Sequence, residues 1–592
     1  MSFEAKRSNY LQSVISHFYM NKFFKNIQSS RNQSFVQLLL VTGILIFANI
    51  LGNYFYGHLD LTEENRFTLT NPTKNLLKSI KEPVTVRILL EGEFPAGFKR
   101  LQSGVKEMLD DMRSETGYIE YSFENPNIGS PKEISMRREE LAKDGITPMA
   151  LTIKGAGETE RKVVYPFAIV TYAGRSFPVN LMENQVPGQP QEVTLNNAVA
   201  TLEYKFANAI QKVMFDKHPK IVFTTGHGEL SEMQTYDLER TLHQFYETKH
   251  IILDSFSSIK PDVSILVIAK PRTAFSEKDK FKIDQYAMNG GKIMWLIDRM
   301  NADLDSMNRA GRFIPSDYPL NLEDILFKYG ARIQPNMVLD MECSYIPLRT
   351  GAQGTGQQFE KFKWYYHPMV SPKSNHPIVK SLDRLNLLFP SRVDTIRTKT
   401  AIKKTVLLES SDHAREQFSP IELNFEILRY DADPTKFDKK RIPMGVMLEG
   451  VFPSLFENRV IPEMTDGLNQ LGQPFKDKSN PTKMLVVADG DIAANAFDVK
   501  NNQPFPTGFN RFMNYTFANK DFLLNAIEYM LDENGVIEAR SKEVKLRLLD
   551  EQRLKSEKLK WQIINILLPL ILVGIFAFVF YFIRKRKYSS PI

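Results

Sequence analysis

The hydrophobic positions of this chain form two uncharged runs near its ends, with a long alternating region between them. The first run, 35–56, is interrupted by Gln37, Asn49 and Asn53, and the second, 563–583, carries no charged residue. A helix needs about 20 consecutive apolar residues to cross the hydrocarbon core of a bilayer. Both runs are therefore predicted to be transmembrane helices, and a buried core helix is the less favoured alternative for each.

Between these runs, short β-branched segments alternate with amphipathic helical segments. The first part predicts strands at 84–90, 118–123, 150–153, 162–172 and 176–181, and helices from Thr70 and over 98–114, 132–143 and 195–214. The second part predicts strands at 220–223, 250–253, 263–269, 292–298 and 483–491, and helices over 236–246, 277–289 and 521–531. Extended runs are also predicted at 405–409, 421–428 and 444–449. Continuous apolar strands separated by helices are typical of a parallel sheet covered on both faces, so the fold class is α/β.

The pattern divides the chain into seven segments. They are a basic N-terminal segment (1–34), a transmembrane helix (35–56), an α/β domain (57–215), a second α/β domain (216–535) with an insertion at about 345–475, a charged juxtamembrane helix (536–562), a second transmembrane helix (563–583) and a basic tail (584–592). We therefore expect a large multi-domain region outside the membrane, held at both of its ends.

The positive charge of the chain is concentrated at its ends. The whole chain has 76 basic and 69 acidic residues, a net charge of +7, whereas residues 1–34 carry five basic residues and one acidic residue and residues 584–587 are all basic. Residues 35–583 are thus left with a net charge of −1. Because positive flanks stay cytoplasmic, both termini are predicted in the cytoplasm and the large domain in the periplasm, on the inner membrane. The near-neutral body also lacks the basic surface that nucleic-acid binding requires.

Composition and motifs exclude several kinds of chemistry. The single cysteine, Cys343, rules out an internal disulfide framework, a thiolate zinc site and a Cys-x-x-Cys redox pair. The sequence contains no Gly-x-x-x-x-Gly-Lys-Ser/Thr motif, so the chain is not a P-loop ATPase by itself. No cofactor, metal site or catalytic residue is predicted.

Candidate binding residues follow the predicted parallel strands, where α/β sheets usually hold ligands. His227 and Glu229 lie in a glycine-rich turn after the strand at 220–223, and Asp298 ends the strand at 292–298. The turn is interpreted as a local hydrogen-bonded structure, with an extracytoplasmic hydrolase or metal-dependent enzyme as the alternative. Asp489 and Asp491 could hold a hard cation, but a turn whose second carboxylate caps a helix at 492–496 is favoured.

Several strings of the sequence resemble the GldG family of gliding-motility-associated ABC transporter proteins. They are Asp60-Leu61-Thr62, Arg66-Phe67-Thr68-Leu69, 90–101, 225–229, 454–459, 488–491 and 540–550. The resemblance covers nearly the whole chain. It implies a non-catalytic, substrate-binding-like accessory subunit that works with an ABC permease and a cytoplasmic ATP-binding subunit, and that contacts the lipid bilayer and an unknown ligand or extracytoplasmic protein.

The same resemblance implies a central domain similar to class I glutamine amidotransferases and to a domain of intraflagellar transport proteins. The cysteine nucleophile of the amidotransferases is missing around the strand at 292–298. The resemblance therefore implies a scaffold that is used for binding.

Overall fold

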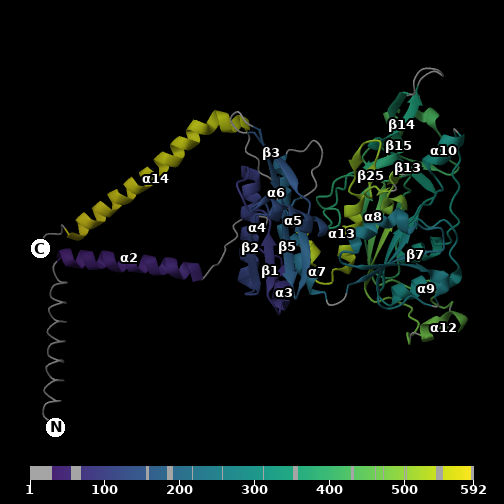
Figure 1. Cartoon of the computed structure of the whole chain (residues 1–592), viewed down its shortest axis with the longest axis horizontal. Coiled ribbons are helices and arrows are strands. Elements are labelled where there is room, and N and C mark those ends of the chain that lie inside the picture. The colour runs from purple at the N-terminus through teal and green to yellow at the C-terminus, as the bar shows by residue number, and fades with distance from the viewer. Residues whose placement is uncertain are drawn as a thin grey trace, which may run out of the picture.

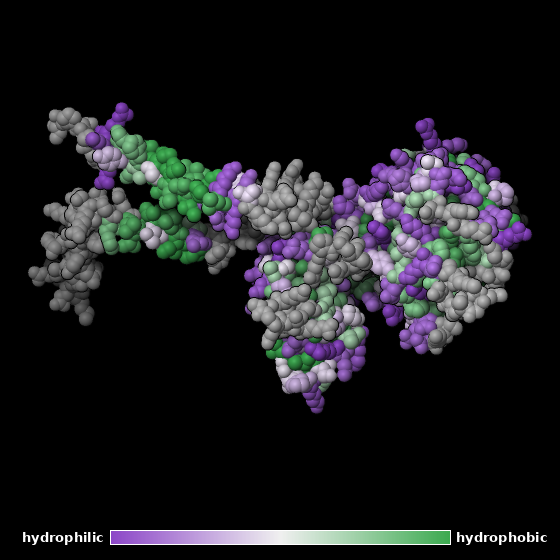
Figure 2. All heavy atoms as spheres, turned by 90° about the horizontal axis from the view of Figure 1, so that it is seen from above, coloured by the Kyte–Doolittle hydropathy of each residue, from purple (hydrophilic) through white to green (hydrophobic). Residues whose placement is uncertain are grey.

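The structure is a computed structural model that describes most of the chain. It covers residues 30–54, 68–154, 159–182, 191–215, 218–256, 258–310, 312–350, 358–428, 432–459, 462–470, 472–498, 501, 503–541 and 551–588. Two α/β units lie next to each other, and helices α2 (Ser30–Tyr54) and α14 (Glu551–Tyr588) project from the side of the smaller unit (Figures 1 and 2). The mixed α/β class predicted from the sequence is confirmed.

The smaller unit is built on a four-stranded sheet in the order β2-β1-β5-β6. Strands β1 and β2 are parallel, and β5 is antiparallel to both β1 and β6. Alternate residues of β1 are buried, and Val84 and Val86 share a core with Leu101 of α4 and Phe206 of α7. Its elements are α3 (Asn71–Ser79), β1 (Val84–Ile88), α4 (Ala96–Glu115), β2 (Ile119–Phe123), α5 (Pro131–Lys143), β3 (Met149–Lys154), β4 (Thr159–Val164), β5 (Phe167–Tyr172), β6 (Arg175–Asn180), α6 (Gln191–Ala200) and α7 (Leu202–Met214).

The larger unit is built on a seven-stranded sheet in the order β18-β21-β22-β10-β9-β7-β8. The five strands from β22 to β8 are parallel to one another, whereas β21 and β18 are antiparallel additions at one edge. The strands are β7 (Lys220–Thr225), β8 (Glu247–Ile252), β9 (Val263–Ala269), β10 (Lys292–Leu296), β18 (Ile402–Glu409), β21 (Pro443–Gly450) and β22 (Thr482–Val487). The predicted parallel sheet is thus present, and β18 and β21 from the predicted insertion at 345–475 extend it.

Helices cover both faces of this sheet. On β9, Val267 belongs to one core, together with residues of α8 (Glu232–Leu242) and α13 (Asn519–Leu531). Its neighbour Ile268 belongs to the opposite core, together with residues of α9 (Glu277–Met288) and α11 (Glu323–Tyr329). Successive side chains of a strand point to opposite faces, which explains why β9 carries apolar residues toward both faces.

Smaller β-sheets and short helices complete the larger unit. They are α10 (Leu304–Ala310), β11 (Arg312–Phe313), β12 (Ala331–Ile333), β13 (Asn336–Asp340), β14 (Cys343–Thr350), β15 (Gln358–Val370), β16 (Leu385–Asn386), β17 (Val393–Thr395), β19 (Ala414–Phe418), β20 (Leu423–Asn424), α12 (Pro462–Gln470), β23 (Phe497–Asp498), β24 (Gln503–Pro504), β25 (Phe509–Asn510) and β26 (Tyr515–Thr516). Short 3₁₀ turns are η1 (Leu253–Ser255), η2 (Phe425–Leu428), η3 (Pro434–Lys436), η4 (Asp491–Ala493) and η5 (Val536–Ser541).

Four predicted elements differ from the structure. The charged helix predicted at 536–562 starts as the 3₁₀ turn η5 and is α-helical from Glu551, and 542–550 lie outside the described residues. The run at 162–172 forms two strands, because Pro166 lies between them and has no N–H to donate. The helix at 195–214 is two helices that meet at Thr201, whose hydroxyl donates to the carbonyls of Asn197 and Ala198. The run at 421–428 is extended only at β20 and continues as the 3₁₀ turn η2.

The two apolar helices expose their hydrophobic side chains. Ser556–Arg586 within α14 is long and apolar enough to cross a membrane, and this confirms the second predicted span as a candidate. In α2, Leu38–Ile50 is a shorter apolar helix, so the first span stays a prediction. Figure 2 shows hydrophobic surface gathered on these two helices, whereas much of the visible surface of the two units is hydrophilic.

Candidate functional site

The predicted binding residues lie after three of the parallel strands of the larger unit. His227 and Glu229 follow β7, Asp298 follows β10, and Asp489 and Asp491 follow β22. Strand β7 lies between β8 and β9, so the chain reverses its direction of winding beside β7. A reversal of this kind leaves a crevice at the carboxyl ends of the strands, where open α/β sheets bind ligands.

The loop after β7 is held in a tight conformation by its glycines. Gly226 and Gly228 have φ angles of +111° and +76°, which residues other than glycine rarely adopt. The carbonyl of His227 accepts hydrogen bonds from the backbone N–H groups of Arg272 and Thr273, at 2.7 and 3.0 Å. The loops after β7 and β9 are thus tied together across the crevice.

The His227 side chain is buried among charged groups of this unit. Its ring stacks on Phe275 with the centroids 3.8 Å apart. Nδ1 lies 3.4 Å from Glu229 Oε1, and Nε2 lies 3.5 Å from Asp279 Oδ2. Burial alone would lower the pKa of His227, but the two carboxylates raise it to about 9. His227 is therefore a cation at neutral pH, enclosed by its own counter-ions.

Asp279, the residue that completes this group, was not predicted from the sequence. Asp279 lies in the first turn of α9, where Ser276 caps the helix. The hydroxyl of Ser276 donates to the Asp279 carboxylate at 2.7 Å. Lys282 also lies 2.9 Å from Asp279. An acidic residue in a first helical turn usually serves the helix itself, so only the three-dimensional structure reveals its contact with His227.

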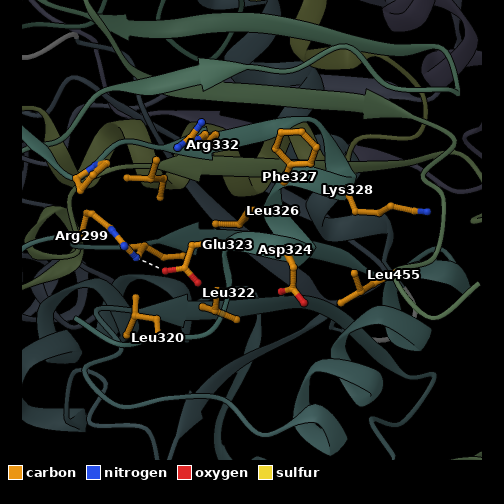
Figure 3. Close-up of a pocket in the computed structure, with 13 residues that line it drawn as sticks. Arg299, Leu320, Leu322, Glu323, Asp324, Leu326, Phe327, Lys328, Arg332 and Leu455 are labelled. Atoms are coloured by element: carbon orange, nitrogen blue, oxygen red, sulfur yellow. Dashed lines mark hydrogen bonds and ion pairs between the residues drawn. The ribbon is translucent and has the colours of Figure 1, made fainter. Parts of the chain in front are cut away.

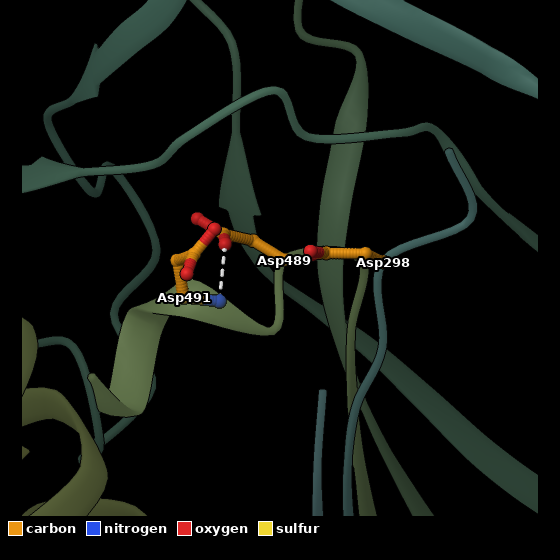
Figure 4. A group of neighbouring side chains, drawn as sticks. All are labelled: Asp298, Asp489 and Asp491. Atoms are coloured by element: carbon orange, nitrogen blue, oxygen red, sulfur yellow. Dashed lines mark hydrogen bonds between the residues drawn. The ribbon is translucent and has the colours of Figure 1, made fainter. Parts of the chain in front are cut away.

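The three predicted aspartates come together in the structure. One carboxylate oxygen each of Asp298, Asp489 and Asp491 lies within 4.8 Å of the others (Figure 4). Asp489 is fully buried, and its two oxygens accept hydrogen bonds from the N–H groups of Leu388 and Asp491, both at 2.8 Å. Burial and the two neighbouring carboxylates raise the pKa of Asp489 well above its usual value.

An internal cation forms ion pairs with two members of this acidic group. The ammonium of Lys270 lies 3.2 Å from Asp298 Oδ2 and forms an ion pair with Asp491. Although burial lowers the pKa of Lys270, Asp298 and Asp491 raise it further than burial lowers it. The ammonium of Lys270 thus lies against two of the three carboxylates, where it would compete with a divalent cation.

The predicted role of Asp491 as a helix cap is wrong. Residues 491–493 form only the 3₁₀ turn η4, and its N-cap residue is Gly490, which has no side chain. Instead, Asp489 accepts from the N–H of Asp491 and holds the turn, which leaves the Asp491 carboxylate for Lys270. A lysine 221 residues away in the sequence decides the role of Asp491.

A cavity of about 450 Å³ lies beside Asp298, between the end of β10 and helix α11 (Figure 3). Its lining residues are Ile297, Arg299, Leu320, Leu322, Glu323, Asp324, Leu326, Phe327, Lys328, Arg332, Ile333, Pro335 and Leu455. No local sequence pattern predicted this cavity. The sequence signal available was Leu455, which belongs to the GldG-like string 454–459.

A match to a known family defines the class of this protein. Residues 218–526, over half of the chain, match the model of an auxiliary family described as an "ABC-type uncharacterized transport system". The chain belongs to this family of ABC transport auxiliary proteins. Residues 63–171, in the smaller unit, match a domain of unknown function.

Two similar proteins match large parts of the chain, but their descriptions name no activity. An uncharacterized protein of Borreliella burgdorferi is 21% identical over 559 residues, which cover 92% of this chain and 96% of that protein. A solved structure, "mmIFT52 N-terminal domain", is 11% identical and covers 53% of this chain and 98% of its own, with a TM-score of 0.30. That score is too low to support a conclusion about the fold, and the likeness to class I amidotransferases stays a prediction.

Proposed function

We propose that this protein is a non-catalytic, membrane-anchored accessory subunit of an ABC transport complex. The observation that carries the proposal is the match of residues 218–526 to the ABC transport auxiliary family. The sequence lacks a P-loop, so ATP would be hydrolysed by a separate cytoplasmic subunit, and a separate permease would form the pathway. The GldG resemblance adds gliding motility as the process served.

The proposal includes two anchors in the inner membrane, with both termini in the cytoplasm and the body in the periplasm. The chain enters and leaves the smaller unit at neighbouring points, because Pro72 in α3 lies beside Gly535, just before η5. Figure 1 shows α2 and α14 projecting on the same side, with the N-terminal end of α2 and the C-terminal end of α14 farthest from the body. This arrangement and the basic residues at both ends of the chain support a helical hairpin anchored in one bilayer.

The strand-end groups support a scaffold that is used for binding. His227 lies between two carboxylates and is 6% exposed, and Lys270 forms ion pairs with Asp298 and Asp491. A hydrolytic site would instead need a base that can reach a substrate proton. The rival hypothesis of a His227/Glu229 enzyme is tested by metal analysis of the purified chain and by His227→Ala, since stoichiometric bound metal would favour it.

Co-purification in mild detergent tests the accessory role. We expect the intact chain to recover an ABC permease and an ATP-binding subunit, and a chain that ends after Ser541 to lose both. A matched control replaces Ile563–Ile583 with an alternating leucine–alanine segment of equal length, which keeps the anchor but changes its surface. If the leucine–alanine chain keeps the partners and the truncated chain loses them, membrane anchoring is enough for association. If both chains lose the partners, the surface of the helix 563–583 is needed for recognition. Equal recovery with the truncated chain would refute the role.

A further inference from the structure

The cavity beside Asp298 has an apolar interior. Leu320 and Leu322 lie on one side of it and Phe327 on the other, with Leu455 at one end (Figure 3). The leucines at 320 and 322 are 2% exposed, whereas Phe327 is 52% exposed and forms part of the mouth. A volume of about 450 Å³ lies within the range of cavities that bind small molecules, which are mostly apolar with a few polar groups.

The charged groups at the rim are nearly all matched within the protein. Glu323 pairs with Arg299, whose second nitrogen lies 3.1 Å from Asp317. Asp324 Oδ2 lies 2.8 Å from the ammonium of Lys280. On the far side, Lys328 Nζ lies 3.4 Å from Glu457 Oε2. Each of these charged side chains is therefore paired with an opposite charge of the protein.

Arg332 is the exception. It lies in β12 opposite Asp394 of β17, but Asp394 instead accepts from Arg392 Nε at 2.6 Å and from Gln334. Among the residues that the structure describes, Arg332 has no ion-pair partner. One positive charge, on a planar group with several N–H donors, is thus left over at the mouth of an apolar cavity.

Buried hydrogen bonds hold the walls of the cavity in place. Asp284 of α9 is fully buried and accepts from the hydroxyls of Ser454 and Tyr329, at 2.7 and 3.0 Å, and from the N–H of Leu455, at 2.8 Å. These bonds join the end of α11 to the string 454–459. A cavity with fixed walls binds a ligand at a lower entropic cost than one that must first be ordered.

We propose that this cavity binds a small apolar molecule that carries one carboxylate. The apolar part would lie against Leu320, Leu322 and Phe327, and the carboxylate would accept two hydrogen bonds from Arg332. A doubly charged phosphate would meet only one unmatched cation beside the carboxylates of Glu323 and Asp324, so a single negative charge fits better. This inference goes beyond the accessory role and does not depend on it.

Binding of 4-phenylbutyrate and of the uncharged 4-phenylbutanol to the full chain tests the proposal. The chain is placed in lipid nanodiscs, and ligand-observed NMR titrations are corrected with empty nanodiscs. We expect saturable binding of both probes, with the acid bound about five-fold more tightly than the alcohol, the factor that one exposed ion pair supplies. Arg332→Gln is expected to remove this preference, and Phe327→Ala to weaken both probes by several-fold.

Two variants at exposed residues outside the cavity act as matched controls for Arg332→Gln and Phe327→Ala. Arg113→Gln removes an exposed arginine of the smaller unit, and Phe359→Ala removes a phenylalanine that is 62% exposed outside the cavity. Neither is expected to change the affinities. Equal affinity for the acid and the alcohol, a preference that survives Arg332→Gln, or no saturable binding above empty nanodiscs would overturn the proposal. Failed co-purification would remove the accessory role and leave this result unaffected.

Discussion

Lys270 occupies a position where many α/β proteins hold a charged ligand. Its backbone has a φ of +55°, which is uncommon outside glycine, and its ammonium lies among Asp298, Asp489 and Asp491. A strained backbone at a cluster of buried charges persists only when its surroundings fix it. Here Lys270 is held by its ion pairs with Asp298 and Asp491 and by the hydrogen bond that its backbone N–H donates to the Leu296 carbonyl at 2.8 Å.

Replacement of Lys270 by methionine would leave the carboxylates without a cation. We expect Lys270→Met to lower the free energy of unfolding by about 3–5 kcal/mol, because breaking a buried ion pair leaves an uncompensated charge. Millimolar Ca²⁺ should restore part of the loss in the variant and have no effect on the wild type. Thermal unfolding with and without Ca²⁺ measures both effects, with Lys99→Met at an exposed ion pair as the control. An equal Ca²⁺ response in wild type and variant would contradict this account.

The raised pKa of His227 predicts how stability depends on pH. The folded state holds this proton more tightly than the unfolded state, because the pKa rises from 6.5 to about 9. The contribution is therefore fully present below pH 6.5 and is lost as the pH rises towards 9. It amounts to at most about 3 kcal/mol. The stability difference between wild type and His227→Gln should shrink over that interval in chemical unfolding at several pH values.

The exposed His413 offers a matched control for this measurement. His413→Gln removes an imidazole that lies outside this buried group and is measured over the same pH values. A difference between wild type and His227→Gln that stays constant from pH 6 to pH 9.5 would show that folding does not raise the pKa of His227.

At the scale of elements, the loop after β22 packs against the loop after β9, with Gly490 in close contact with Lys270. A Cβ atom on Gly490 would lie 2.6 Å from Cβ and 2.8 Å from Cα of Lys270, so no other residue fits without a shift of the backbone. We expect Gly490→Ala to destabilise the protein by about 1–3 kcal/mol through overpacking. Gly117→Ala, where a Cβ meets no atom within 4 Å, is the control in the same thermal unfolding assay. Equal stability of the two variants would rule out this close approach.

Local sequence pattern predicted most elements of the two units, because apolar periodicity and capping residues act over a few neighbours. The parallel strands 220–225, 263–269 and 292–296 were found from apolar runs alone. The antiparallel edge formed by β18 and β21 was not, since the pairing of distant strands leaves no local signal. The domain boundaries and the first membrane span stay predictions.

The candidate site was predicted only in part, for the same reason. The sequence placed His227, Asp298 and Asp489 at strand ends, where the structure has them. It did not indicate Lys270 or Asp279, the partners that decide what these residues do. The cavity was missed because its walls come from β10, α11, β12 and Leu455, which only the tertiary fold brings together.

At the scale of the whole molecule, a buried ion pair joins the two units. Lys212 of α7 pairs with Glu528 of α13, and the Lys212 ammonium lies 5.0 and 4.9 Å from the ring centres of Phe177 and Phe245. These two rings are 4.1 Å apart and belong to different units. The contact ties the smaller unit, which leads to both projecting helices, to the family domain.

Removal of this lysine is expected to uncouple the two units. Lys212→Met leaves Glu528 buried without its cation and removes both ring contacts, which should cost about 3–5 kcal/mol. In calorimetry of the full chain, we expect the unfolding transition to split or broaden relative to wild type. Lys249→Met, at an exposed ion pair, should leave it unchanged. An unaltered transition in Lys212→Met would show that this contact does not couple the units.

The most direct test of the whole account asks on which side of the membrane the body lies. Cys343 is 2% exposed and its pKa is raised to about 12 by burial, so the native thiol should stay unlabelled. New cysteines are placed in the body by Lys403→Cys, at an exposed side chain, and in the C-terminal tail by Ser590→Cys. With a membrane-impermeant maleimide on intact spheroplasts, we predict labelling of Lys403→Cys at once and of Ser590→Cys only after lysis. Labelling of Ser590→Cys in intact spheroplasts, with Lys403→Cys protected, would contradict a periplasmic body anchored from the cytoplasmic side.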